Sequence, residues 1–233
     1  MTETPAPIEP EAIRVSGFKE TETFDFEGPA GRIEAILNQP AQSTPARAAA
    51  VICHAHPLHG GMMHFKVIFR AAKALQSQGI ASLRFNFRGV GRSEGSHDRG
   101  TGEQDDARAA LSEMARRFPG LPLILGGFSF GAAMAVKVAA TDDRVKAVVI
   151  LGFPITRVDS TADLSGLRQP RLFVQGSDDE FGPGHAIRQM VAGLPEPRRL
   201  EVIEGADHFF TGRLDELQNA IQDWASTLPW ESR

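Results

Sequence analysis

The sequence predicts an α/β protein with a mostly parallel sheet that carries helices on both faces. Short apolar runs, typical of buried strands, alternate with segments whose apolar residues recur at helical spacing. This alternation favours parallel strands, because each crossover helix then covers one face of the sheet. The length of 233 residues and the hydrophobic content of 42% fit a single domain with a sizeable core.

The alternation starts with a predicted hairpin. Thr21–Phe26 and Arg32–Leu37 have strand patterns and are joined by the turn GPAG. Ala48–Cys53 is a short apolar strand. Phe65–Gln78 is expected to be a helix, because its apolar residues recur at intervals of three and four, and Gly79 ends it.

The pattern continues to the carboxyl terminus. Ala81–Phe87 is strand-like and runs into the glycine-rich segment RGVGRSEGS. Glu103–Phe118 opens with acidic residues, and we expect Asp105 and Asp106 to stabilise a helix there through its dipole. The remaining predicted strands are Leu121–Phe128, Val145–Leu151, Arg171–Gln175 and Arg198–Ile203, and the remaining helices are Gly131–Ala140, Gly184–Leu194 and Arg213–Leu228. The prediction is therefore an eight-stranded sheet.

Composition excludes several classes of protein. The net charge is −4 and the pI is about 6.0, without the basic stripe that nucleic-acid binding requires. The single cysteine, Cys53, cannot form an internal disulfide, which favours a reducing compartment. Residues 1–15 lack a signal-peptide pattern and are expected to be flexible, with one domain over residues 16–233. No apolar run is long enough to span a membrane, so we expect a cytoplasmic protein without a membrane or nucleic-acid partner; a homodimer is left open.

Polar residues follow three of the predicted strands. In parallel sheets, ligands bind beyond the carboxyl ends of the strands, so these positions are candidates for a site. Ser129 lies in GFSFG, which fits the pattern G-x-S-x-G between a strand and a helix. Asp178 and Asp179 follow a later strand in QGSDDEFGP, and His208 follows the last strand in GADHFF. The order serine, aspartate, histidine is that of a hydrolase triad.

These motifs together resemble the α/β-hydrolase superfamily, and in particular its small dienelactone-hydrolase-like branch of serine hydrolases. The matching stretches are HAHPLHGGMM, LRFNFRGVGRSEG, GGFSFGAAMA, QGSDDEF and GADHFFTGRL, which run from about residue 51 to residue 214. The resemblance implies a three-layer α/β-hydrolase fold. It also implies that Ser129 is the nucleophile, that His208 is the general base and acid, and that Asp179 orients it. The family pattern Gly-x-x-Asp with a later proline favours Asp179 over Asp178.

Acyl transfer also needs hydrogen-bond donors for the oxyanion. The backbone N–H of Phe130, one residue past the proposed nucleophile, is expected to be one of them. The second is expected in the loop after Ala48–Cys53, from His56 or alternatively from Leu58, because Pro57 has no N–H.

The predicted function is a serine hydrolase that cleaves small carboxylic esters through an acyl-enzyme, with no cofactor and no metal. A thioesterase or amide hydrolase with the same triad, and a non-catalytic binding module on the same fold, are the alternatives. Dienelactone hydrolases use cysteine as nucleophile, so Ser129 argues against that particular activity. His54, His56, His59 and His64 could form a metal site, but no carboxylate lies near them in the sequence.

The predicted pocket is shallow. In this superfamily, lids are usually inserted after the strand that here is Val145–Leu151. The following stretch, from Gly152 to Gln169, has only about 18 residues, too few for a large cap domain. We expect Phe153, Ile155 and Leu164 in this stretch to form one wall of an open pocket.

Overall fold

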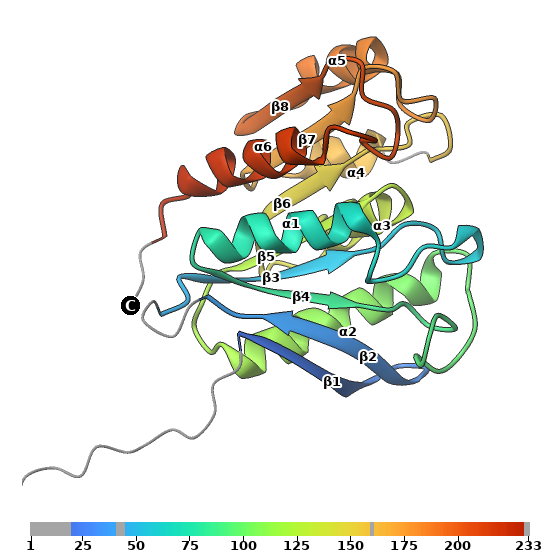
Figure 1. Ribbon diagram of the computed structural model, residues 1–233, viewed down its shortest axis with the longest axis vertical. Coiled ribbons are helices and arrows are strands. Elements are labelled where there is room, and N and C mark those ends of the chain that lie inside the picture. Colours follow the sequence, from blue (N-terminus) through green and yellow to red (C-terminus); the bar gives the residue numbers. More distant parts are fainter. Residues whose placement is uncertain (1–19, 41–44, 159–160, 231–233) are drawn as a thin grey trace, which may run out of the picture.

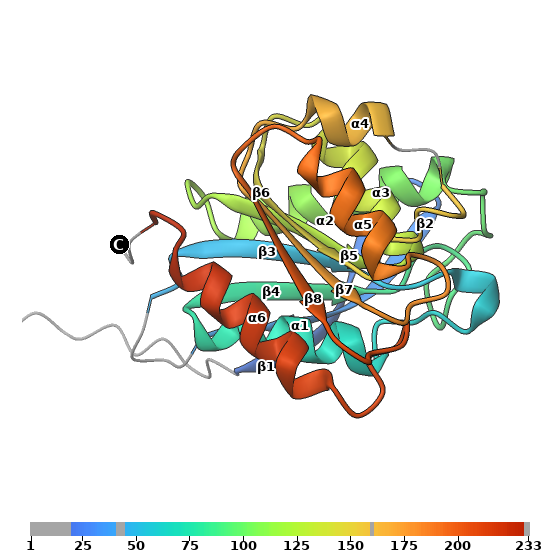
Figure 2. The same cartoon turned by 90° about the horizontal axis from the view of Figure 1, so that it is seen from above.

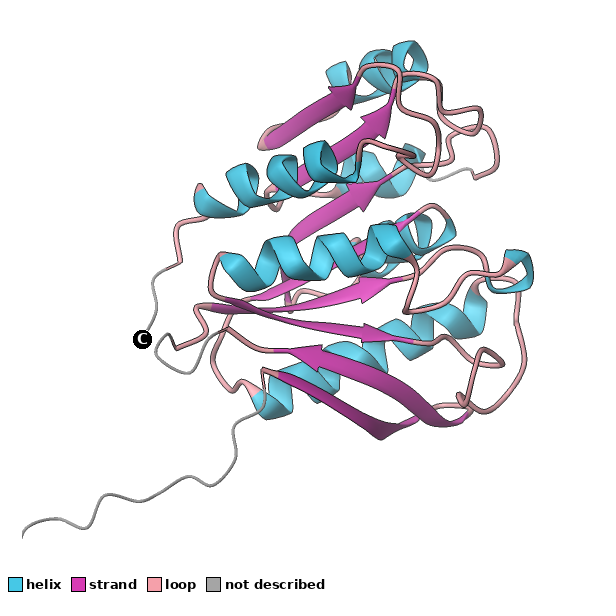
Figure 3. Ribbon diagram, in the orientation of Figure 1, coloured by secondary structure: helices cyan, strands magenta, loops and turns pink. Residues whose placement is uncertain are grey.

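A computed structural model describes residues 20–40, 45–158 and 161–230. Strands and helices alternate along them, as Figure 3 shows. The strands are β1 Thr21–Gly28, β2 Gly31–Asn38, β3 Ala48–Cys53, β4 Ile80–Phe85, β5 Leu123–Phe128, β6 Val145–Leu151, β7 Arg171–Gly176 and β8 Arg198–Ile203. The helices are the 3₁₀ turn η1 Pro57–His59, α1 Lys66–Ser77, α2 Thr101–Arg117, α3 Phe130–Ala139, α4 Thr161–Gly166, α5 Gly184–Ala192 and α6 Leu214–Ser226. The predicted flexible segment 1–15 lies outside the described residues.

The strands form one eight-stranded sheet in the order β1-β2-β4-β3-β5-β6-β7-β8. The hairpin β1–β2 and the β2–β4 pair are antiparallel, and all other neighbouring strands are parallel. The central strands β3, β4, β5 and β7 are buried along their whole length, as expected of strands that are covered on both faces. The predicted α/β fold with a mostly parallel sheet is confirmed.

Helices cover both faces of the sheet. Helices α1 and α6 pack side by side on one face, and α2, α3 and α5 lie on the other (Figures 1 and 2). Each face has its own apolar core: one includes Ile68 of α1 and Ile221 of α6, the other Leu111 of α2 and Ile187 of α5. The carboxyl ends of the parallel strands meet at one edge, on the right in Figure 1, so the loops after β5, β7 and β8 converge there.

The stretch between β6 and β7 differs from the prediction. It contains helix α4, and Phe153 and Leu164 are fully buried in the core beside α3. Because both side chains are used to anchor this stretch to the core, the prediction that they line a pocket was wrong. Ile155 is partly buried and packs against the same core. The described residues of this stretch contain no inserted cap domain.

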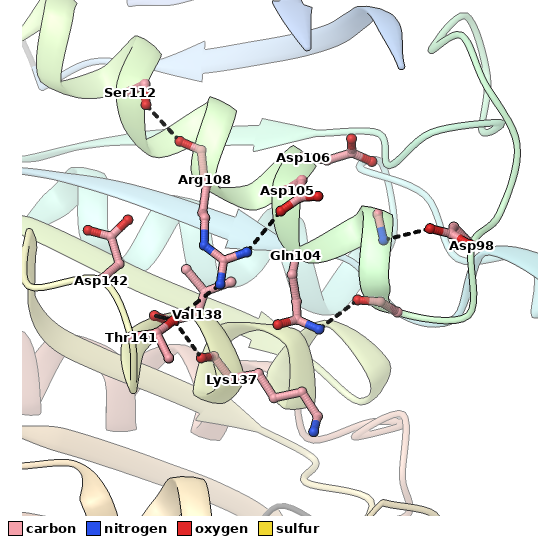
Figure 4. Close-up of polar contacts among 12 residues, drawn as sticks. Asp98, Gln104, Asp105, Asp106, Arg108, Ser112, Lys137, Val138, Thr141 and Asp142 are labelled. Carbon is pink, nitrogen blue, oxygen red and sulfur yellow. Dashed lines mark hydrogen bonds and ion pairs between the residues drawn. The ribbon is translucent and has the colours of Figure 1, made fainter. Parts of the chain in front are cut away.

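The prediction for the two acids of α2 also needs correction. Asp105 forms an exposed pair with Arg108 at 3.0 Å (Figure 4). Asp106 is fully buried and binds Arg88, which follows β4, through both carboxylate oxygens, with Nη2–Oδ1 at 2.8 Å and Nε–Oδ2 at 3.0 Å. Its Oδ2 also accepts the backbone N–H of Arg88 at 3.0 Å. Asp106 thus ties the loop after β4 to α2 and does not merely stabilise the helix dipole.

We therefore predict that Asp106→Ala destabilises the protein by about 3–5 kcal/mol, because it leaves the guanidinium and backbone N–H of Arg88 without their buried partner. Asp105→Ala, one residue earlier, is the matched control. It removes only an exposed ion pair and is expected to cost less than about 1 kcal/mol. Urea unfolding measures both, and equal losses in the two variants would contradict the assignment.

Candidate active site

Ser129 occupies a sharp turn between β5 and α3. Its φ is 56° and its ψ is −119°, a backbone conformation that non-glycine residues rarely adopt. The flanking glycines allow the turn to close. A Cβ on Gly127 would lie 2.3 Å from the carbonyl group of Gly131, and a Cβ on Gly131 would lie 2.4 Å from the carbonyl oxygens of Cys53 and His54. The pattern GFSFG is thus a steric requirement of the turn.

The serine, histidine and aspartate that the motifs singled out lie within hydrogen-bond distance of one another. Ser129 Oγ lies 2.9 Å from His208 Nε2, and His208 Nδ1 lies 2.7 Å from Asp179 Oδ2. Asp179 is 1% exposed and His208 is 5% exposed. Because the three residues follow β5, β7 and β8, the sheet edge brings together side chains up to 79 positions apart in the chain.

The other acids near His208 have different partners. Asp178 accepts a hydrogen bond from the hydroxyl of Ser177 at 2.8 Å and makes no contact with the histidine. Asp207 accepts the backbone N–H groups of Phe209 and Thr211 through Oδ1. Burial opposes the ionisation of Asp207, but the hydrogen bonds from Thr211 and Phe209 outweigh it and lower the pKa of this carboxyl. Asp207 therefore stabilises the turn that carries His208.

The two expected oxyanion donors are on neighbouring elements. Phe130 is the first residue of α3, so its N–H has no acceptor within the helix. The N–H of His56 donates to no described residue, whereas the N–H of Leu58 donates to His56 Nδ1 at 3.2 Å. The rings of His56 and Phe130 are 4.9 Å apart, which places the loop after β3 beside the start of α3. This arrangement favours His56 over Leu58.

Comparisons with known proteins agree with this architecture. The family described as "Alpha/beta hydrolase domain" matches residues 46–228. The chain belongs to the α/β-hydrolase family. It is 34% identical to the uncharacterized protein RP471 of Rickettsia prowazekii (strain Madrid E), over 87% of this chain and 88% of the relative.

Two solved structures are similar to this hydrolase over most of their length. A serine hydrolase homologue from Coxiella burnetii has a TM-score of 0.82 and 36% identity, with 89% of this chain and 99% of that chain covered. XC6422 from Xanthomonas campestris, described as a serine hydrolase without a lid, has a TM-score of 0.83 and 33% identity, with 91% and 97% covered.

Aromatic rings surround the catalytic candidates of this hydrolase. Phe128, Phe181 and Phe209 lie with their ring centroids 4.9, 4.7 and 5.2 Å from that of His208. Phe128 is fully buried, whereas Phe209 is 48% exposed and lies at the surface. The rings limit the access of water to the imidazole, which strengthens the hydrogen bond between His208 and Asp179.

The histidine-rich loop does not form a metal site in the described part of the chain. No group of three or more His, Cys, Asp or Glu residues there has an arrangement that could hold a metal ion. His54 is buried, approaches the Ala55 carbonyl through Nδ1 and accepts the N–H of Phe87 through Nε2 at 3.0 Å. Burial lowers the pKa of His54 to about 4, so this residue is a neutral structural link between the loops after β3 and β4.

The pKa of His56 is lowered too, which favours the neutral ring. Burial is the main reason for its lowered pKa, and the neighbouring rings of His59 and His97 act in the same direction. His64 is exposed. Cys53 lies inside β3, where burial raises the pKa of its thiol, so it remains an unreactive core residue.

One residue of the site was missed by the sequence analysis. Gln175, in β7, is 1% exposed and donates to Asp179 Oδ2 at 2.6 Å. A glutamine near the end of a buried strand, four residues before the candidate acid, was the available signal. No helix in residues 20–40, 45–158 and 161–230 is long and apolar enough to cross a bilayer.

We predict that Asp179→Asn lowers kcat by roughly 10⁴-fold, because an amide no longer holds the tautomer of His208 that can accept a proton at Nε2. Asp178→Asn is the matched control and is expected to change kcat less than about twofold, since the carboxylate of Asp178 is hydrogen-bonded to Ser177 and not to His208. Steady-state hydrolysis of p-nitrophenyl acetate compares the two. A larger loss in the Asp178 variant would transfer the role to that residue.

Proposed function

We propose that this α/β hydrolase cleaves small carboxylic esters through an acyl-enzyme formed on Ser129. The observation that carries the proposal is the continuous chain of hydrogen bonds from Ser129 Oγ to His208 Nε2 and from His208 Nδ1 to Asp179 Oδ2, at 2.9 and 2.7 Å. A serine hydroxyl is a poor nucleophile by itself and needs an adjacent base of this kind.

The geometry supports the following sequence of steps. Ser129 Oγ attacks the ester carbonyl while its proton passes to His208 Nε2, and Asp179 stabilises the imidazolium that forms. The N–H groups of Phe130 and His56 stabilise the oxyanion, each contributing about 2.7–4 kcal/mol at the transition state. His208 then protonates the departing alcohol. Water, activated by the same imidazole, cleaves the acyl-enzyme and restores Ser129.

We also propose that the protein acts in the cytoplasm on a small-molecule ester, without cofactor or metal. The single thiol of Cys53 supports a reducing compartment, and the net charge of −4 argues against a nucleic-acid partner.

A fluorophosphonate probe tests the nucleophile. We expect it to label the unaltered protein at Ser129 alone, and Ser129→Ala to lower ester hydrolysis by roughly 10⁴-fold or more, as in other triad knockouts. Ser226→Ala, which removes an exposed hydroxyl on α6, is the control and should leave labelling unchanged. If the unaltered protein neither takes up the probe nor cleaves esters, thioesters or amides, the result favours the non-catalytic binding module.

Substrate size follows from the short stretch between β6 and β7. Without a cap domain in the described residues, the site has little apolar surface to cover a long acyl chain, and each buried CH₂ contributes only ~0.8 kcal/mol. We therefore predict that acetyl to butyryl esters have higher kcat/KM than palmitoyl esters, with no activation at a lipid interface. A series of p-nitrophenyl esters from C2 to C16 measures this preference. A maximum at C10 or longer would contradict the prediction.

A further inference from the structure

Gln175 is buried at the junction of three segments that carry the candidate site. Its Oε1 accepts the backbone N–H of Phe153, in the loop after β6, at 2.8 Å. Its Nε2 donates to Asp179 Oδ2 at 2.6 Å and to the carbonyl oxygen of Gly182 at 2.9 Å. The side chain therefore links β7, the loop after β6 and the loop that carries Asp179.

These partners allow only one orientation of the amide. Nε2 faces two acceptors, which use both of its protons, and Oε1 faces a donor. A flipped amide would turn its oxygen toward a carboxylate and a carbonyl, and its NH₂ group toward an N–H. The backbone packs closely around the amide of Gln175. A Cβ on Gly182 would lie 2.6 Å from Gln175 Nε2 and 2.3 Å from the carbonyl oxygen of Phe153, so only glycine fits at that position.

The same carboxylate oxygen receives both Gln175 and His208. Asp179 accepts four hydrogen bonds: Oδ1 binds the N–H groups of Phe181 and Gly182, and Oδ2 binds Gln175 Nε2 and His208 Nδ1. The amide fixes the angle of the carboxylate plane at the oxygen that faces the imidazole. It also takes up part of the negative charge there, because a hydrogen bond to a carboxylate is a charge-assisted one.

We propose that Gln175 is a positioning residue that acts on catalysis through Asp179. The inference rests on the proposed hydrolase function. Gln175 fixes the orientation of the Asp179 carboxylate and moderates the electrostatic attraction between this carboxylate and His208. The other groups around this imidazole are the Ser129 hydroxyl and the rings of Phe128, Phe181 and Phe209. Asp207 binds the backbone of its own turn and also interacts electrostatically with His208, and the guanidinium of Arg157 lies over the ring of Phe181.

Two near-isosteric variants test the assignment. Gln175→Met removes the donor, and we expect kcat for p-nitrophenyl acetate to fall about tenfold while KM changes less than about twofold, since one of the four hydrogen bonds of Asp179 is lost. The rising limb of the kcat/KM–pH profile should move to higher pH, because a less neutralised carboxylate stabilises the imidazolium more strongly. Gln175→Glu replaces the amide by a carboxyl that, while protonated, can still donate one hydrogen bond to Asp179; its limb should therefore move in the same direction only above the pH at which this carboxyl ionises.

The matched control is Gln169→Met, in the loop before β7. Gln169 donates to the carbonyl oxygen of Ala139 at 3.1 Å and does not touch Asp179. This variant should retain the kcat and the pH profile of the unaltered protein. Thermal unfolding of all variants shows whether they are folded, and Gln175→Glu provides the second measurement if Gln175→Met does not fold.

A double-mutant cycle with Asp179→Asn separates positioning from a purely structural role. If Gln175 acts through the carboxylate, Gln175→Met should change the rate of fluorophosphonate labelling less than about twofold once Asp179 is replaced. The inference is overturned if Gln175→Met causes a further tenfold loss in the Asp179→Asn protein, or if Gln175→Met and Gln175→Glu both leave the pH profile unshifted. Either result leaves the hydrolase function intact. If the unaltered protein is inert toward probe and esters, the hydrolase function itself fails and the inference falls with it.

Discussion

The site depends on the close approach of three backbone segments at the end of β5. The turn at Ser129 leaves no space for side chains at Gly127 and Gly131, whose Cβ atoms would collide with backbone carbonyl groups. Because α3 can therefore start directly against the carboxyl end of β3, the N–H of Phe130 lies close to the loop that carries His56. This packing stabilises the strained conformation of Ser129. The Ser129 hydroxyl lies at the sheet edge, next to His208 in the loop after β8.

Buried polar groups hold the loops around this edge. Asp179 is saturated with hydrogen bonds from the backbone, from His208 and from Gln175. On the other side of the site, the buried Asp106–Arg88 pair and neutral His54 fasten the loop after β4 to α2 and to β3. A buried polar group without a hydrogen-bond partner would lower the free energy of unfolding. Each of these groups therefore restricts its loop to the conformation in which its hydrogen bonds are made. The loops around the candidate site are thus held by polar contacts outside Ser129 and His208.

The surroundings of the histidine are apolar, and those of the aspartate are polar. Rings of phenylalanine cover His208 on several sides, while Asp179 faces mainly donors. This division satisfies the buried carboxylate with hydrogen bonds and leaves His208 Nε2 facing the hydroxyl of Ser129.

The order of strands and helices could be predicted from the sequence, because apolar periodicity and glycine or proline breaks are local properties. The ends of β3, β6 and β8 were predicted to the residue, and GFSFG indicated the turn at Ser129 because its steric demands are also local. The tertiary structure decided what depends on contacts distant in the chain. It placed Phe153 and Leu164 in the core, gave buried Asp106 a partner 18 positions away, and set Gln175 against Asp179. Such partners come from different strands and loops, and only the register of the sheet brings them together.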